Sequence, residues 1–206
     1  MRQILNLLLV FVVFMGFGIY ADAQDNPKLD AHWKVIRGEN VSNSGNSTTL
    51  TMRLQIRCSS PGLHKLNSGD FYIEYDSTYM LFSHNAEAGI DYLWAPAFDP
   101  KTNPLYKYSK VVDFGTNPFD NSGNNLMDVS IIDTSHSQGT LLDSGVWTDV
   151  VDLTWHIEKP GFSTEIIWFM TKEGRVLTNV YESFEDMPKN FDSGDGWAEP
   201  FIVRLE

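Results

Sequence analysis

Hydrophobic and polar residues alternate along two long stretches of this chain, and the alternation predicts two half-buried β-strands. In residues 50–58 the apolar positions are Leu50, Met52, Leu54, Ile56 and Cys58. In residues 151–158 they are Val151, Leu153, Trp155 and Ile157. Successive side chains of a strand point to opposite faces of a sheet, so each stretch has one apolar and one polar face. Each apolar face needs a covering layer, which predicts a two-layer β-sandwich.

Shorter runs of the same period recur between turn-forming residues. We expect these strands to lie at residues 32–37, 71–75, 79–83, 110–114, 126–132, 165–170 and 201–205. Ordered or polar loops are expected at 85–107, 135–145 and 182–199, and a hairpin at 171–181. About nine to eleven strands, without an amphipathic helix or an internal repeat, predict an all-β antiparallel sandwich or jelly roll.

The first 23 residues have the organisation of a secretory signal peptide. Arg2 precedes an apolar run over residues 4–20, and Ala21 and Ala23 provide the small residues of a cleavage site. We therefore expect export and a single mature domain at residues 24–206, secreted or held at the cell surface. No later segment is long and apolar enough to predict a membrane span.

The charge and the single cysteine narrow the expected partners and chemistry. A formal net charge of −12 opposes binding to phosphate backbones and anionic lipid, so nucleic acid and bare membrane are not expected partners. Cys58 is the only cysteine and cannot form an internal disulfide. It lies on the apolar face of its strand, which predicts a buried small hydrophobic residue.

Two segments resemble cohesin-like domains. Residues 71–76 read Phe-Tyr-Ile-Glu-Tyr-Asp, are followed by Leu81 and Phe82, and resemble a strand with its Tyr-Asp turn. Residues 147–157 are similar to the late strand that returns across the core. The resemblance extends over residues 32–205 and is to secreted modules of Bacteroidota-type bacteria. It implies a jelly-roll sandwich related to cohesins and to some carbohydrate-binding modules.

Aromatic residues in the loop at 85–107 are candidates for a sugar-binding platform. A flat ring matches the apolar face of a pyranose, which makes Tyr92, Trp94 and Tyr106 the candidate stacking residues. The alternative is that these rings close the ends of the sandwich, because large aromatic side chains are seldom exposed.

Oxygen-rich loops are candidates for metal binding. Asp192, Asp195 and Glu199 alternate with small and turn-forming residues and could bind a structural Ca²⁺, although Asp and Gly also form ordinary turns. The acids and amides between Asp113 and Asp128 are expected to form a solvated loop.

The strand at 165–170 is apolar on both faces, so Ile167 and Phe169 are candidate interface residues. No catalytic residues are assigned, because no nucleophile elbow, metalloprotease helix or phosphate loop is present. We therefore expect a non-enzymatic binding or assembly module whose partner is a surface or secreted protein, or a second copy of the chain. The alternatives are a polysaccharide-binding module and, as a third class, a secreted hydrolase.

Overall fold

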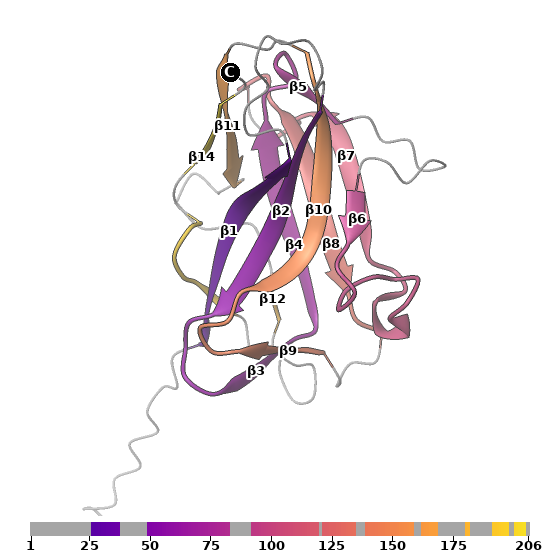
Figure 1. The fold of residues 1–206 in the computed structure, drawn as a ribbon, viewed down its shortest axis with the longest axis vertical. Helices are drawn as coiled ribbons and strands as arrows, with labels where there is room; N and C mark the ends of the chain where they lie inside the picture. Colours follow the sequence, from indigo (N-terminus) through magenta and orange to yellow (C-terminus); the bar gives the residue numbers. More distant parts are fainter. Residues whose placement is uncertain are drawn as a thin grey trace, which may run out of the picture.

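The structure is a computed structural model that describes residues 26–37, 49–82, 92–119, 121–134, 139–158, 162–168, 180–181, 191–197 and 200–204. These residues form two layers of β-sheet, with β1, β2 and β10 drawn in front of β4 and β8 in Figure 1. No helix in the described ranges is long and apolar enough to cross a membrane.

The first layer, named here the β2 sheet, has the order β13–β1–β2–β10, and two short strands share the far edge of β10. Its strands are β1 (Lys28–Arg37), β2 (Thr49–Cys58), β5 (Met80–Leu81), β6 (Tyr92–Trp94), β10 (Thr148–Ile157) and β13 (Asp192–Ser193). Its pairings are antiparallel except for that of β1 with β13, which is parallel.

The second layer, named here the β4 sheet, has the order β14–β11–β4–β8–β7, with a short strand beside β4. Its strands are β4 (Ser68–Tyr75), β7 (Lys110–Thr116), β8 (Asn125–Ile132), β11 (Ser163–Trp168), β12 (Val180–Tyr181) and β14 (Phe201–Arg204). A separate ribbon pairs β3 (Leu63–Leu66) with β9 (Thr140–Asp143), and the 3-10 helix η1 spans Pro104–Tyr106.

The two alternating stretches of the sequence pair with each other. Met52 of β2 lies opposite Leu153 of β10, and Leu54 lies opposite Val151. The predicted alternation of buried and wetter positions is confirmed in β2 and through most of β10. A β-bulge interrupts β10 between Asp149 and Val151 and leaves two consecutive valines buried at the start of the strand.

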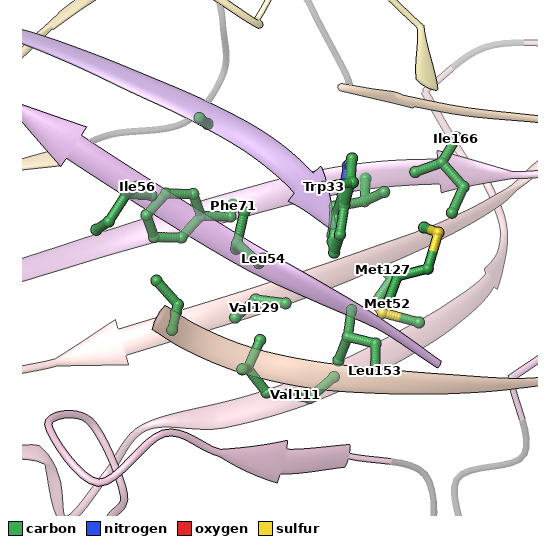
Figure 2. Close-up of a cluster of buried hydrophobic side chains, with 14 of the residues drawn as sticks. Trp33, Met52, Leu54, Ile56, Phe71, Val111, Met127, Val129, Leu153 and Ile166 are labelled. Carbon is green, nitrogen blue, oxygen red and sulfur yellow. The ribbon is translucent and has the colours of Figure 1, made fainter. Parts of the chain in front are cut away.

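The core lies between the two sheets. Figure 2 draws Leu54 and Leu153 of the β2 sheet and Phe71 and Val129 of the β4 sheet within one cluster of buried side chains. Leu54 and Trp155 are fully buried, so the predicted sandwich with an inward apolar face on each long strand is confirmed. Cys58 is also fully buried, as expected for a small hydrophobic residue.

The parallel pairing of β1 with β13 closes one edge of the β2 sheet around a buried carboxylate. Asp30 accepts hydrogen bonds from Arg57 Nε at 2.8 Å, Ser59 Oγ at 3.0 Å and the backbone amide of Asp195 at 2.8 Å. Gly196 has φ +89°, and a Cβ there would lie 1.9 Å from the carbonyl oxygen of Ala31. Only glycine therefore allows the two segments to approach this closely.

Several expectations from the sequence need correction or fall outside the described residues. The loop expected at 85–107 contains β6 and η1, the loop expected at 135–145 contains β9, and the loop expected at 182–199 contains β13. Fourteen strands are present in the described residues, more than expected, because bridges of two to four residues have too short a pattern to recognise. The hairpin expected at 171–181 lies outside the described residues except for β12.

A pair of leucine substitutions tests the assignment of the core. Leu54→Ala removes buried side-chain volume and should lower the free energy of unfolding by about 2–5 kcal/mol. Leu93→Ala makes the same chemical change at a residue that is 69% exposed, and it should change stability by less than about 0.5 kcal/mol. Urea denaturation measures both, and equal effects would contradict the assigned core.

Candidate functional site

The outer face of the β2 sheet carries charged groups that already pair with one another. Arg53 Nε and Nη2 donate to Asp152 at 2.6 and 2.9 Å, and its Nη1 donates to Asp149 at 2.6 Å. Gln55 donates to Asp149 and contacts the ring of His32 at 2.8 Å. These partly exposed ion pairs add little stability, but they satisfy the charged groups of this face within the chain itself.

Trp147 belongs to the same polar face and is covered by protein groups. The guanidinium of Arg57 lies 4.5 Å from the centre of the indole ring, and the ring of His32 lies 3.7 Å from it. The cation–π contact and the ring contact occupy surface that a ligand would otherwise use.

The outer face of the β4 sheet has a different composition. Phe71, Ile73 and Tyr75 of β4 point into the core, so the residues that alternate with them point outward. The same rule applied to the neighbouring strands defines the β4 outer face, made of Asp70, Tyr72 and Glu74 (β4); Lys110, Val112 and Phe114 (β7); Leu126, Asp128 and Ser130 (β8); Glu165 and Ile167 (β11); and Ile202 and Arg204 (β14).

Large apolar side chains are exposed on the β4 outer face. Phe114 is 53% exposed at the β7 side, and Ile202 is 59% exposed at the β14 side. Between them, Val112, Ile167 and Tyr72 are half-buried. The outward residues of β8 at the centre of the face, Leu126, Asp128 and Ser130, are buried, so the exposed apolar side chains lie toward its two sides. Large apolar and aromatic side chains of this kind are enriched in the cores of protein interfaces.

A turn at one end of this face holds a further exposed ring. Asn117 is buried and donates a hydrogen bond from its amide to Glu74 of β4. Its amide oxygen accepts from the backbone of Phe119 at 2.9 Å, which forms an Asx-type turn. Phe119 is 68% exposed, so the buried Asn117–Glu74 contact presents an aromatic side chain beside the sheet.

The strand register places two carboxylates close together in the middle of the face. Asp128 lies opposite Tyr72 on one side and Val112 on the other. Asp70 lies opposite Ser130, which donates a hydrogen bond to the Asp70 carboxylate. Asp70 and Asp128 are therefore diagonal neighbours, a relation with a Cα separation of about 7–8 Å.

Asp128 is buried although its side chain points to the outside of the sheet. It is 5% exposed, and its Oδ1 atom has no hydrogen-bond partner. Burial, with a further contribution from the charge of Asp70, raises the pKa of Asp128 to about 7, while Lys110 acts in the opposite direction. Burial and the two carboxylates also raise the pKa of Tyr72.

These residues were not among the sites predicted from the sequence. Asp113 and Asp128 lie in β7 and β8, as the strands expected at 110–114 and 126–132 predict, and not in the solvated loop that was also considered for them. The available signal was the polar–apolar alternation in residues 126–132, which was used to predict a strand but not to select its outward side chains. Asp70 and Tyr72 alternate in the same way with the core residues of β4.

The aromatic residues predicted to bind sugar do not form an exposed platform. Tyr106 is fully buried, donates to the carbonyl of Leu66 at 2.8 Å and accepts from the amide of Thr140 at 2.7 Å. Trp94 is buried where β6 pairs with β10, and Tyr92 packs partly buried against the core. These placements agree with the alternative in which the rings close an end of the sandwich.

Asp192 and Asp195, two of the residues predicted to bind calcium, make different contacts. Asp192 accepts a hydrogen bond from Asn26 at 3.2 Å, and the backbone of Asp195 binds Asp30. Glu199 lies outside the described residues, among which no group of three Asp, Glu, His or Cys side chains could hold a metal ion. The calcium site therefore stays a prediction without support from the described geometry.

Of the two candidate interface residues, the structure describes Ile167. Ile167 is half-buried on the β4 outer face and lies opposite Glu74, on the face defined above. Phe169 lies outside the described residues. Their role in an interface stays a prediction.

Comparison with known proteins identifies the fold. No protein-family model and no curated protein matches the sequence. The sixth cohesin of scaffoldin B from Acetivibrio cellulolyticus has a TM-score of 0.50 and 14% identity over 88% of this chain and 99% of that one. The fold is that of a cohesin domain. The CaDoc0917–CaCohA2 complex agrees, with a TM-score of 0.52 and 12% identity over 87% of this chain and 99% of that one. CaCohA2 is from Clostridium acetobutylicum.

The cohesin-like sandwich expected from residues 71–76 and 147–157 is thus confirmed as a fold. The first segment forms most of β4, and the second forms β10 with the residue before it. At these identities the likeness describes the fold, and it assigns no partner to this chain. An origin in Bacteroidota stays a prediction.

The buried Asp128 carboxyl generates a pH-dependent prediction. The folded protein holds this proton more tightly than the unfolded chain, so stability falls as pH rises from the ordinary pKa of 3.8 to about 7. Asp128→Asn removes this cost, and the variant should exceed the wild type in stability at pH 8 by on the order of 2–4 kcal/mol. Near pH 4 the two proteins should differ little.

Urea denaturation at pH 4.5, 6 and 8 measures this difference. Asp143→Asn removes an exposed carboxyl from β9 and controls for the change in net charge. A stability difference between wild type and Asp128→Asn that is constant across these pH values would show that Asp128 is not the titrating group.

Proposed function

We propose that this protein is an exported, non-catalytic docking module of cohesin type that binds another protein through its β4 outer face. The observation that carries the proposal is the exposure of Phe114 and Ile202 on opposite sides of one sheet face. Large apolar side chains of this kind become the anchors of protein interfaces when a partner buries them. The expected partner is a surface or secreted protein.

The similar structures support this proposal. The Acetivibrio cellulolyticus cohesin was solved in complex with a Cel5 dockerin, and CaCohA2 was solved in complex with CaDoc0917. Each of these cohesin folds therefore binds a second protein. Dockerins are for this reason the first class of partner to test.

The β2 outer face is a weaker candidate for docking. A partner that bound there would have to compete with the bonds from Arg53 to Asp149 and Asp152. Breaking paired charges and removing them from water costs free energy that new contacts must recover. Leu81 and Leu93 are also exposed on this face, but they lie on short strands at its edge beyond β10. Phe114 and Ile202 of the β4 outer face can be buried without breaking these ion pairs.

The geometry gives less support to the alternative functions. A polysaccharide would need exposed rings, but Trp94 and Tyr106 are buried. No described contact of Asp70 or Asp128 assigns either carboxylate a catalytic role.

Export is proposed from the sequence of residues 1–23, which lie outside the described residues. If the Ala21–Ala23 segment is a cleavage site, the secreted protein should begin at Gln24. Mass spectrometry of the protein recovered from the culture medium measures the N-terminal residue. An intact Met1 on the exported protein would contradict cleavage.

Substitutions on the two outer faces test the docking proposal. Partners captured from the secreted fraction are identified by mass spectrometry, and each purified partner, together with a dockerin panel, is titrated by calorimetry. Phe114→Asp and Ile202→Asp should each weaken binding about tenfold or more, because a charge replaces an apolar anchor.

Leu93→Asp is the matched control, because Leu93 is 69% exposed on β6 of the opposite sheet. This variant should bind like the wild type. Loss of binding in Leu93→Asp with full binding in the other two variants would place the interface on the β2 sheet. Binding to glycans on an array, with no protein partner captured, would contradict the protein-docking function.

A further inference from the structure

The Asp70–Asp128 pair has a feature that the fold does not require. Buried carboxylates are normally hydrogen-bonded or paired with a charge, because burial without a partner costs free energy. Asp30 follows this rule with three donors. Asp128 is almost equally buried, yet its Oδ1 has no donor.

The groups around Asp128 do not neutralise it. From β4 it faces the carboxylate of Asp70 and the phenol of Tyr72, and from β7 it faces Lys110 and Val112. Lys110 attracts the Asp128 carboxylate, but no Lys, Arg or His in the described part of the chain forms an ion pair with it. The hydroxyl of Ser130 donates to Asp70 instead.

These surroundings favour a cation supplied from outside the chain. Oδ1 has almost no accessible surface, so a lysine or arginine side chain reaches it only when the half-buried Tyr72 or Val112 turns aside. It would then give Oδ1 its missing donor and compensate two neighbouring negative charges at once. The half-buried Tyr72 and Val112 flank Asp128 and can cover the apolar stem of such a side chain. The net charge of −12 adds a long-range attraction for a basic partner.

We propose that the Asp70–Asp128 pair is a receptor for a basic side chain, arginine or lysine, of the docked protein. The inference rests on the proposed docking function and specifies the chemistry of the partner at the centre of the interface. The flanking apolar residues Phe114 and Ile202 then contact the neutral surface around that basic residue. The pair thereby selects partners by charge.

A small probe tests the receptor without requiring the natural partner. The purified ¹⁵N-labelled protein is titrated at pH 8 and low salt with the peptide acetyl-Gly-Arg-Gly-amide. The neutral control peptide carries citrulline, which has the shape of arginine without its charge. Saturable shifts are expected at the amides of Tyr72, Val112 and Ser130 with the arginine peptide, and at least about fivefold weaker binding with the citrulline peptide.

Variants and pH make the test specific. Asp128→Asn and Asp70→Asn should each weaken binding of the arginine peptide about fivefold or more, whereas Asp143→Asn on β9 should leave it unchanged. Binding should also weaken at pH 5.5, where the Asp128 carboxyl holds its proton.

Three results would overturn the inference. Equal shifts with the arginine and citrulline peptides would remove the role of charge, and unchanged binding in Asp128→Asn would remove the role of this carboxylate. Tight binding of Ca²⁺ at the same amides, from a CaCl₂ titration, would make the pair a metal site instead.

The two proposals can fail separately. Arginine-peptide binding without any protein partner would refute the docking function and keep the receptor. A protein partner that is lost in Phe114→Asp but binds Asp128→Asn at full strength would keep the docking function and refute the receptor.

Discussion

The pairing of β2 with β10 is the constraint on which the remaining structure depends. It joins strands whose threonines Thr51 and Thr154 are 103 residues apart in the sequence but whose hydroxyl groups lie 3.0 Å apart. The pairing turns two alternating stretches into one apolar surface, which the β4 sheet covers. Burial of this surface provides the main driving force for folding, because a chain with a single cysteine, Cys58, forms no internal disulfide.

Two buried aspartates show how the same residue type serves different purposes in this fold. Asp30 is held by Arg57, Ser59 and the backbone of Asp195, and it ties β1 to the late segment that closes the sheet. Its contacts are complete within the chain. Asp128 projects from the outer side of the β4 sheet but is buried, and its Oδ1 has no donor among the described residues. An unsatisfied buried group of this kind calls for an explanation that the fold alone does not supply.

The two outer faces of the sandwich divide the remaining polar and apolar groups unequally. On the β2 sheet, Arg53 and its carboxylate partners satisfy each other. Leu81 and Leu93 are exposed at the edge of that face. On the β4 sheet, Phe114 and Ile202 are exposed toward the two sides, and the Asp70–Asp128 pair lies between them. The two faces therefore differ chiefly in how their charged groups are compensated.

Local periodicity was sufficient to predict the fold class, because an alternation of period two is written into consecutive residues and needs no knowledge of neighbouring strands. Residues 50–58 and 151–158 therefore predicted a sandwich, and Cys58 was correctly expected in its core. Tertiary pairing decided everything that depends on residues distant in the sequence. It buried Trp94 and Tyr106, recruited residues from expected loops into β9 and β13, and placed Asp128, of the strand expected at 126–132, diagonally beside Asp70. Strand register decides which outward side chains lie next to one another. That register is fixed only when the two sheets bury their apolar faces together.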